Sequence, residues 1–250
     1  MQLIDTHCHI HEPTYPLDAD ATLIRAREAG IEKLICVGTS QQSSREALDF
    51  AAQRDNVFAS IGVHPHDTQD GWQELDELFV RPKLIAVGEI GLDYFYTHSP
   101  REVQIEALQA QIELALKHNL PIIFHVREAF ADFWPIFDNF HDIRGVLHSF
   151  TDTEAQLEQG LGRGLLVGVN GISTFTKSEA QKKMFASIPL DRLLLETDAP
   201  FLTPAPLRGK VNEPAFVAQI AEYHMRIRGI SLEQIATTTS ANADALFAIT

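Results

Sequence analysis

The sequence is poor in cysteine and lacks any long apolar run. Its 250 residues include only Cys8 and Cys36, too few for a disulfide framework, and both lie in apolar, strand-like segments, so we expect buried thiols in a reducing compartment. No segment approaches the roughly 18 apolar residues that a membrane span needs, and the N-terminus lacks the basic and apolar regions of a signal peptide. We therefore expect a soluble, cytoplasmic protein without a membrane partner.

Positive charge is also scarce. The chain has 20 basic and 34 acidic residues and a net charge of −14, which argues against a broad surface for duplex nucleic acid. Bound divalent cations would invert the potential at a carboxylate-lined site, so a small anionic group can still be held there. A phosphodiester partner is therefore expected to be a small molecule or a DNA end, single-stranded or frayed rather than duplex.

No linker rich in proline, glycine or serine divides the chain, so we predict one domain over residues 1–250. Eight short apolar segments read as strands buried on both faces. These segments are 3–4, 33–38, 57–63, 84–88, 121–124, 145–147, 165–169 and 193–195. Predicted helices lie between them, at 17–29, about 40–53, 72–80 and 100–118, and two more follow the last strand. Alternating strands and helices indicate a parallel α/β sheet, either open or closed. The count of eight and the length favour the (β/α)8 TIM barrel, and the first strand–helix turn lacks the glycine-rich dinucleotide fingerprint of a doubly wound sheet.

Metal-ligating residue types follow most of these strands. In a (β/α)8 barrel the carboxyl ends of the strands carry the active site. The residues at those ends are His7, His9, His64, Glu89, His125, His148 and Asp198. His7 and His9 are two residues apart on a strand and therefore leave from one face. Each residue alone also has a structural explanation, such as a solvated loop acid or a core histidine, but their coincidence at one rim predicts a metal centre.

With His64 set aside, four histidines and two carboxylates exceed the three or so protein ligands of one open catalytic site. They suit two divalent cations with a bridging carboxylate, for which Glu89 is the best placed. His7, His9 and Asp198 would complete one cation site, and His125 with His148 the other. Asp198 is the expected catalytic residue beside Glu89, because it can orient the activated water or take its proton. The mixed nitrogen and oxygen ligands suit zinc or manganese and tolerate magnesium.

Four more residues are candidates for supporting roles. His64 is either a polar wall that contacts substrate or a spectator. Arg127 shares a strand face with His125 and is either a contact for an anionic substrate or part of a surface ion pair. Glu196 and Asp93 are expected to orient metal ligands by hydrogen bonds.

The ordered set of motifs resembles one family over essentially the whole chain. The motifs are DTHCH at 5–9, GVHP at 62–65, GEIGLDY at 88–94, HSFT at 148–151, LETDAP at 195–200 and GKVNEP at 209–214, with Asn242 and Ala243 near Leu246 and Phe247. They are similar to the motifs of TatD-like metal-dependent deoxyribonucleases. The resemblance implies a hydrolase barrel, two divalent ions on the six ligands named above, and 3'–5' exonucleolytic cleavage of DNA. His11, Glu12 and Val126 depart from the family pattern, which bears on substrate preference.

Two other functions remain open on the sequence. One is an amidohydrolase-type enzyme acting on a small amide or ester. Such enzymes often bridge their metals with a modified lysine, where this chain offers Glu89. The other is a non-catalytic metal-binding interaction protein, which the presence of Asp198 disfavours. We expect a monomer without an obligate protein partner.

Overall fold

The computed structural model describes residues 2–96 and 98–249. Its eight strands are β1 (Leu3–Cys8), β2 (Ile31–Val37), β3 (Val57–Ile61), β4 (Leu84–Asp93), β5 (Ile122–Arg127), β6 (Gly145–Leu147), β7 (Leu166–Val169) and β8 (Leu193–Leu195). They follow one another in chain order in one sheet, and the strand pairs described are parallel. This confirms the predicted α/β class with eight strands.

Helices lie in the connections between the strands, and two more, α8 and α9, follow β8. They are α1 (Ala19–Glu28), α2 (Gln41–Ala52), α3 (Arg101–Lys117), α4 (Phe130–Phe137), α5 (Glu154–Gly162), α6 (Ile172–Phe175), α7 (Glu179–Ser187), α8 (Val217–Arg228) and α9 (Leu232–Phe247). Short 3-10 helices are η1 (Pro65–Asp70), η2 (Gln73–Val80), η3 (Leu190–Arg192) and η4 (Pro214–Phe216). No helix among the described residues is long and apolar enough to cross a membrane.

The chain forms two compact units. Unit 1 combines Met1–Cys36 with Ser149–Thr250, and unit 2 is Val37–His148. The prediction of a single domain stays a prediction, and each unit is described by itself.

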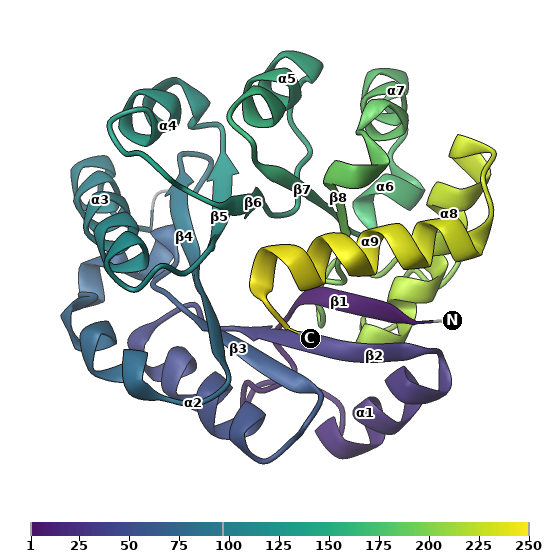
Figure 1. Cartoon of the computed structure of the whole chain (residues 1–250), viewed down its shortest axis with the longest axis horizontal. Coiled ribbons are helices and arrows are strands. Elements are labelled where there is room, and N and C mark those ends of the chain that lie inside the picture. Colours follow the sequence, from purple (N-terminus) through teal and green to yellow (C-terminus); the bar gives the residue numbers. More distant parts are fainter. Residues whose placement is uncertain (1, 97, 250) are drawn as a thin grey trace. The chain divides into compact units, whose positions relative to one another are not determined.

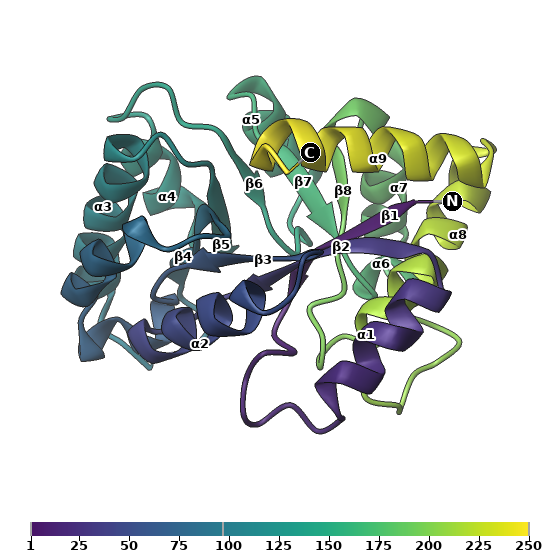
Figure 2. The same cartoon turned by 60° about the horizontal axis from the view of Figure 1, so that its bottom comes forward.

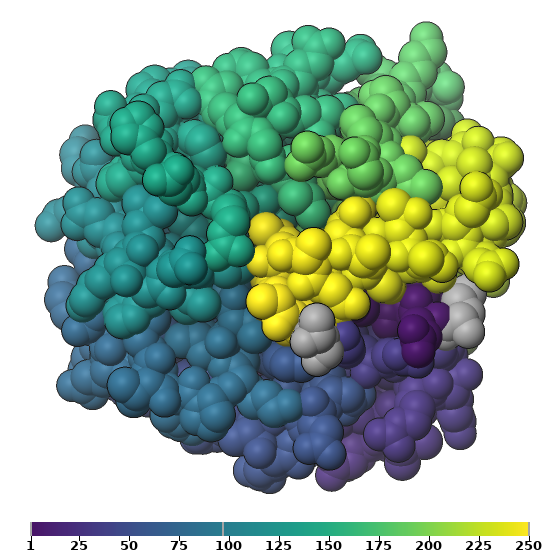
Figure 3. Space-filling model, viewed as in Figure 1, coloured from purple at the N-terminus to yellow at the C-terminus, as the bar shows by residue number. Residues whose placement is uncertain are grey.

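In unit 1, the two ends of the chain pack together. Strand β1 pairs with β2, β7 pairs with β8, and Cys8 forms a parallel bridge with Ala199 just beyond β8. Helix α9 packs along β1 and β8 (Figures 1 and 2). In the space-filling view the yellow surface of α9 adjoins the purple N-terminal strand (Figure 3). These contacts fix the end of β1, where His7 and His9 lie.

In unit 2, α2, α3 and α4 pack outside β3, β4 and β5 (Figure 1). Strands β4 and β5 end at Asp93 and Arg127, beyond the predicted ends at residues 88 and 124. The predicted strands were too short because polar residues and glycine interrupt the apolar runs. Gly91 permits the two strands to approach, since a Cβ there would overlap the carbonyl oxygen of His125. Glu89 and His125 therefore lie inside paired strands rather than in the loops after them.

The predicted helix faces need one correction. The apolar residues at helical spacing after the last strand predict a helix whose buried face carries Phe216, Ile220, Tyr223 and Ile227. The structure buries Ile220 as predicted, but it buries Val217, Ala221 and His224 in place of the other three. The chain enters α8 through η4, so Phe216 caps the helix rather than starting it, and the apolar face is turned. Segment 72–80 is likewise a 3-10 helix. Ser231 and Gln234 form a capping box at the start of α9, as a serine followed three residues later by a glutamine predicts.

Candidate functional site

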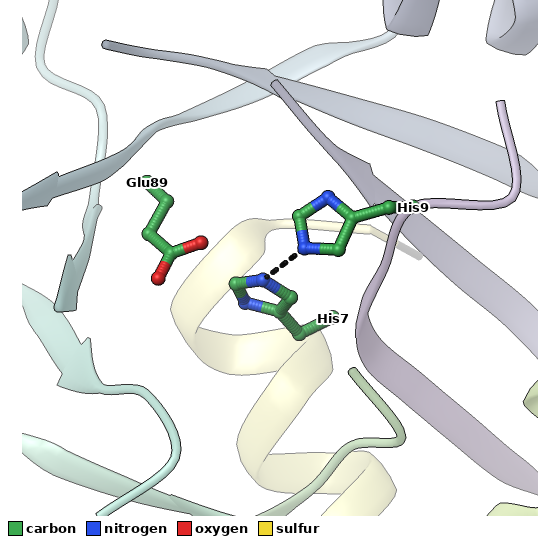
Figure 4. A group of neighbouring side chains, drawn as sticks. All are labelled: His7, His9 and Glu89. Carbon is green, nitrogen blue, oxygen red and sulfur yellow. Dashed lines mark hydrogen bonds between the residues drawn. The ribbon is translucent and has the colours of Figure 1, made fainter. Parts of the chain in front are cut away.

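Unit 1 brings together His7, His9 and Asp198. The Nε2 atoms of the two buried histidines are 3.1 Å apart (Figure 4). Asp198 Oδ1 lies 3.4 Å from Nε2 of His9 and 3.8 Å from Nε2 of His7. The Asp198 side chain is 16% exposed, whereas that of His7 is fully buried. Two imidazole nitrogens and one carboxylate oxygen thus converge within unit 1, and the carboxylate is the member of the three that water reaches best.

Main-chain hydrogen bonds hold this cluster. The amide of Asp198 donates to the carbonyl of His7 at 2.8 Å, and the amide of His9 donates to the carbonyl of Ala199 at 2.7 Å. Asp198 has a φ of 60°, a left-handed conformation that aspartate tolerates better than most residues. The two ligand-bearing segments are therefore fastened together by their backbones.

Asp5 also helps to join the segments that carry His7 and Asp198. Its fully buried carboxylate accepts hydrogen bonds from the amide and hydroxyl of Thr197, at 2.9 and 2.5 Å, and from the amide of His7 at 3.3 Å. Burial raises the pKa of Asp5 to about 8, although these hydrogen bonds oppose the shift. Asp5 lies two residues before His7 and therefore shares its strand face, but no role was predicted for it from the sequence.

Glu196 is a buried carboxylate of unit 1 that directly follows β8. Its Oε1 accepts a hydrogen bond from the amide of Ser149 at 2.6 Å, and Ser149 has a φ of 49°. A Cβ at Gly168 would overlap the Glu196 carboxylate, so this glycine makes room for it. Glu196 thus stabilises the turn that directly follows His148.

Unit 2 gathers three histidines around Glu89. Glu89 Oε1 lies 2.8 Å from Nδ1 of His125, 3.7 Å from Nε2 of His64 and 3.8 Å from Nε2 of His148. Glu89 is 4% exposed. The potential ligand atoms of His64, Glu89 and His125 all lie within 4.8 Å of one another, a spacing that one cation could span. His64 therefore belongs with the metal-capable groups of unit 2, a more central place than the sequence suggested for it.

Asp93 supports this cluster from β4. Its Oδ2 lies 3.0 Å from Nε2 of His125 and 3.0 Å from Nε2 of His66. Burial disfavours a charged His125, but its hydrogen bonds to Asp93 and Glu89 prevail and raise the pKa of His125 to about 9. Burial likewise opposes ionisation of Asp93, but the hydrogen bonds from His125 and from the amide of Tyr96 outweigh it and lower the pKa of Asp93. The pair is an ionised carboxylate that orients an imidazole.

His64 has the opposite electrostatics. Burial, with a contribution from the charge of His125, lowers its pKa well below the ordinary value. Its Nδ1 accepts a hydrogen bond from the amide of His66 at 3.1 Å at the start of η1. His64 is therefore a neutral imidazole with an oriented ring, as metal ligation requires. Sequence reasoning assigned no role to His66, although the His-Pro-His spacing was visible.

Arg127 lies at the exposed end of β5. Its guanidinium carbon is 3.9 Å from the ring centre of Phe95 and 5.0 Å from that of Tyr96. Among residues 2–96 and 98–249, no carboxylate lies within 4 Å of this guanidinium, so a surface ion pair does not occupy it. Phe95 and Tyr96 were missed by the sequence analysis, because exposed aromatic residues in a loop have no periodic signal.

Comparison with known proteins agrees with the motifs. The family model described as TatD related DNase matches residues 4–248. The uncharacterised metal-dependent hydrolase YabD of Bacillus subtilis is 36% identical over 99% of both chains. The 3'-5' ssDNA/RNA exonuclease TatD of Erwinia amylovora is also 36% identical, over 99% of this chain and 100% of its own.

Solved structures show the same fold. The TatD homologue YJJV from Escherichia coli K12 is 31% identical, covers 98% of both chains and superposes with a TM-score of 0.91. The hydrolase TatD family protein of Entamoeba histolytica is 26% identical over 100% of this chain and 99% of its own, with a TM-score of 0.89. This likeness confirms the predicted (β/α)8 TIM-barrel class. The chain belongs to the TatD family of metal-dependent hydrolases.

Proposed function

We propose that this hydrolase cleaves phosphodiester bonds of DNA as a 3'–5' exonuclease that prefers single-stranded ends. Three relatives at 33–36% identity carry the name 3'-5' ssDNA/RNA exonuclease, and the net charge of −14 disfavours a broad duplex surface. The observation that carries the proposal is the Glu89 carboxylate with three histidine nitrogens within 3.8 Å. That donor set suits a divalent cation rather than a covalent nucleophile.

The proposed centre holds two divalent cations. His7, His9 and Asp198 would hold one, His125 and His148 would hold the other, and Glu89 would serve both. Zinc or manganese suits this mixture of imidazole and carboxylate, and magnesium is tolerated. The cations would polarise the phosphodiester and lower the pKa of the attacking water. A cation beside His125 would replace the positive charge that the protonated imidazole carries, because a ligating imidazole must be neutral.

The chain's own residues complete the reaction. Asp198, the ligand whose carboxylate is partly exposed, orients the attacking water and accepts its proton. The water oxygen bonds to phosphorus while the bond from phosphorus to the leaving oxygen breaks. Asp93 keeps the His125 ring oriented throughout, as carboxylates behind metal-bound histidines commonly do.

A substrate panel tests the proposal. The protein is reconstituted with zinc, manganese or magnesium and assayed on 5'-labelled single-stranded DNA, blunt duplex DNA and an N-acyl amino acid. We expect a ladder that shortens from the 3' end on the single strand and slower cleavage of the duplex. Turnover of the amide without any phosphodiester cleavage would contradict the proposal and support the amidohydrolase alternative. Bound metal without turnover of any substrate would support a non-catalytic role.

Two further predictions accompany this function. We propose that the enzyme works as a monomer in the cytoplasm, which sedimentation of the purified protein and fractionation of cells would test.

A further inference from the structure

Two large aromatic side chains are exposed side by side in unit 2. Phe95 is 48% exposed and Tyr96 is 42% exposed. Their rings meet edge to face, with centres 4.7 Å apart. The other large exposed apolar residues in the described chain are Ile24, Val80 and Phe201, which are isolated in the sequence. An adjacent aromatic pair is unusual on a protein surface and favours a binding role over incidental exposure.

Asp93 fixes the position of this pair beside the Glu89 cluster. Asp93 Oδ1 accepts hydrogen bonds from the amides of Phe95 and Tyr96, at 3.0 and 3.1 Å. Its other oxygen binds His125, as described above. The same carboxylate therefore positions a candidate metal ligand and the two exposed rings.

In unit 2, neighbouring side-chain rings lead from the candidate ligand His125 to the exposed Tyr96. The ring of His66 lies 6.4 Å from that of His125 and 5.3 Å from that of Tyr96, centre to centre. Tyr96 also stacks on His98 with an angle of 28° between the planes. The ring of His66 therefore lies between that of His125 and the exposed ring of Tyr96.

Two arginines add positive charge to the aromatic segment. Arg127 stacks on Phe95, and the guanidinium carbon of Arg101 is 4.2 Å from the ring centre of Tyr94. Neither guanidinium has a carboxylate within 4 Å in the part of the chain that the structure describes. In a protein with a net charge of −14, two arginines without an ion pair, at the start of α3 and at the end of β5, favour an anionic ligand beside the aromatic residues 94–96.

A hollow of about 300 Å³ adjoins Tyr96. Asp93, Tyr96, Arg101 and Gln104 are among the residues that line it. Its volume is near the lower end of the range for small-ligand pockets. The segment therefore offers an aromatic face, a cation and room for a flat ring.

We propose that Phe95 and Tyr96 form a base-stacking platform for the terminal nucleotides of a single strand, with Arg127 binding the phosphate between them. This deepens the proposed function and rests on it. Aromatic stacking accepts every base but requires the base to be unpaired, so the platform would select single-stranded ends without reading sequence. It would hold the strand while the scissile phosphate lies at the Glu89 cluster.

The test compares two oligonucleotides that differ only in their bases. One is single-stranded oligothymidylate, and the other carries abasic tetrahydrofuran sugars at its last three 3' positions. In the wild-type enzyme we expect KM to be about tenfold lower for the strand with bases, since stacking contributes on that scale. The double variant Phe95→Leu/Tyr96→Leu should bring the ratio of the two KM values close to one.

Three further variants separate stacking from other effects. Tyr96→Phe keeps the ring and should keep the wild-type KM ratio. Arg127→Gln should raise KM on both strands alike, because both keep their phosphates. Phe50→Leu is the matched control. Phe50 lies on α2, and the guanidinium carbon of Arg54 is 3.8 Å from its ring centre, so this variant also removes a ring that packs against an arginine. It should leave the ratio as in the wild type.

The outcomes distinguish this inference from the proposed function. Cleavage of both strands with equal KM in the wild type would overturn the platform and leave the nuclease proposal standing. If no strand is cleaved, anisotropy of the two labelled strands with the full-length protein supplies the readout. Tighter binding of the strand with bases, lost in the double leucine variant, would support the platform without catalysis. Equal binding of both strands would overturn it.

Discussion

The two histidine clusters of this protein are stabilised in different ways. In unit 1 the segments of His7 and Asp198 are joined by main-chain hydrogen bonds, and Asp5 adds its own hydrogen bonds to backbone amides. In unit 2 the backbone of His125 is paired with β4, but the rings of His125 and His66 are oriented by side chains, above all by the carboxylate of Asp93. Main-chain hydrogen bonds persist when a single side chain is replaced, whereas a side-chain hydrogen-bond network is disrupted when one member is removed. The geometry of the unit 2 cluster should therefore be the more sensitive to mutation.

Glu89→Gln should have the largest effect. Glu89 is the common partner of three histidines, so loss of its charge should lower the affinity for both cations. A metal ion contributes several kcal/mol of transition-state stabilisation, so we expect kcat to fall by about a thousandfold or more. Elemental analysis of the purified variant would show less than half of the wild-type metal. Unchanged metal content would refute the bridging role.

Asp198→Asn should affect one cluster and leave the other. The amide keeps the shape of the side chain but cannot accept a proton, and general-base catalysis contributes on the order of a hundredfold or more. We expect kcat to fall by about a hundredfold, with at least half of the metal retained, because the ligands of unit 2 are untouched. If all metal were lost, the two clusters would depend on each other more than their separate hydrogen bonds suggest.

Asp93→Asn tests the side-chain network directly. Loss of the carboxylate behind a ligating histidine typically costs about ten- to a hundredfold in metal affinity or activity, and we expect that range here. Asp5→Asn is the matched control in unit 1. Asparagine can still accept from the Thr197 amide and donate to its hydroxyl, so activity should change by less than about threefold. Equal losses in both variants would contradict the contrast between the two clusters.

More could be predicted from the sequence about the strands of the fold than about the residues that support the site. Buried parallel strands are recognisable in the sequence as apolar runs, and β6 and β8 have the predicted bounds. The ligand-type residues could be named because they follow such runs. Asp5, His66 and the pair of Phe95 and Tyr96 were not assigned roles, since their contacts join residues distant in the sequence or depend on loop conformation. Likewise, nothing in the sequence indicates that the Arg127 guanidinium packs on the rings of Phe95 and Tyr96.

The smallest predicted effect concerns His224, a titrating group outside both clusters. Its ring is fully buried in α8, and its Nε2 lies 3.2 Å from the hydroxyl of Ser173. Burial, with a contribution from the charge of Arg228, lowers the pKa of His224 to about 3. An unfolded chain would protonate this histidine near its ordinary pKa of about 6.5, so below that pH the unfolded state binds a proton that the native state does not.

Acidification should therefore cost the wild type stability that a His224→Gln variant does not lose. The stability difference between the wild type and the variant should fall by about 1 kcal/mol between about pH 7 and pH 5.5, and it should continue to fall toward the native pKa. Urea unfolding of both proteins at each pH measures this difference. Because every other titrating group is common to the two proteins, a difference that stays constant with pH would mean that native His224 takes up a proton as readily as the unfolded chain.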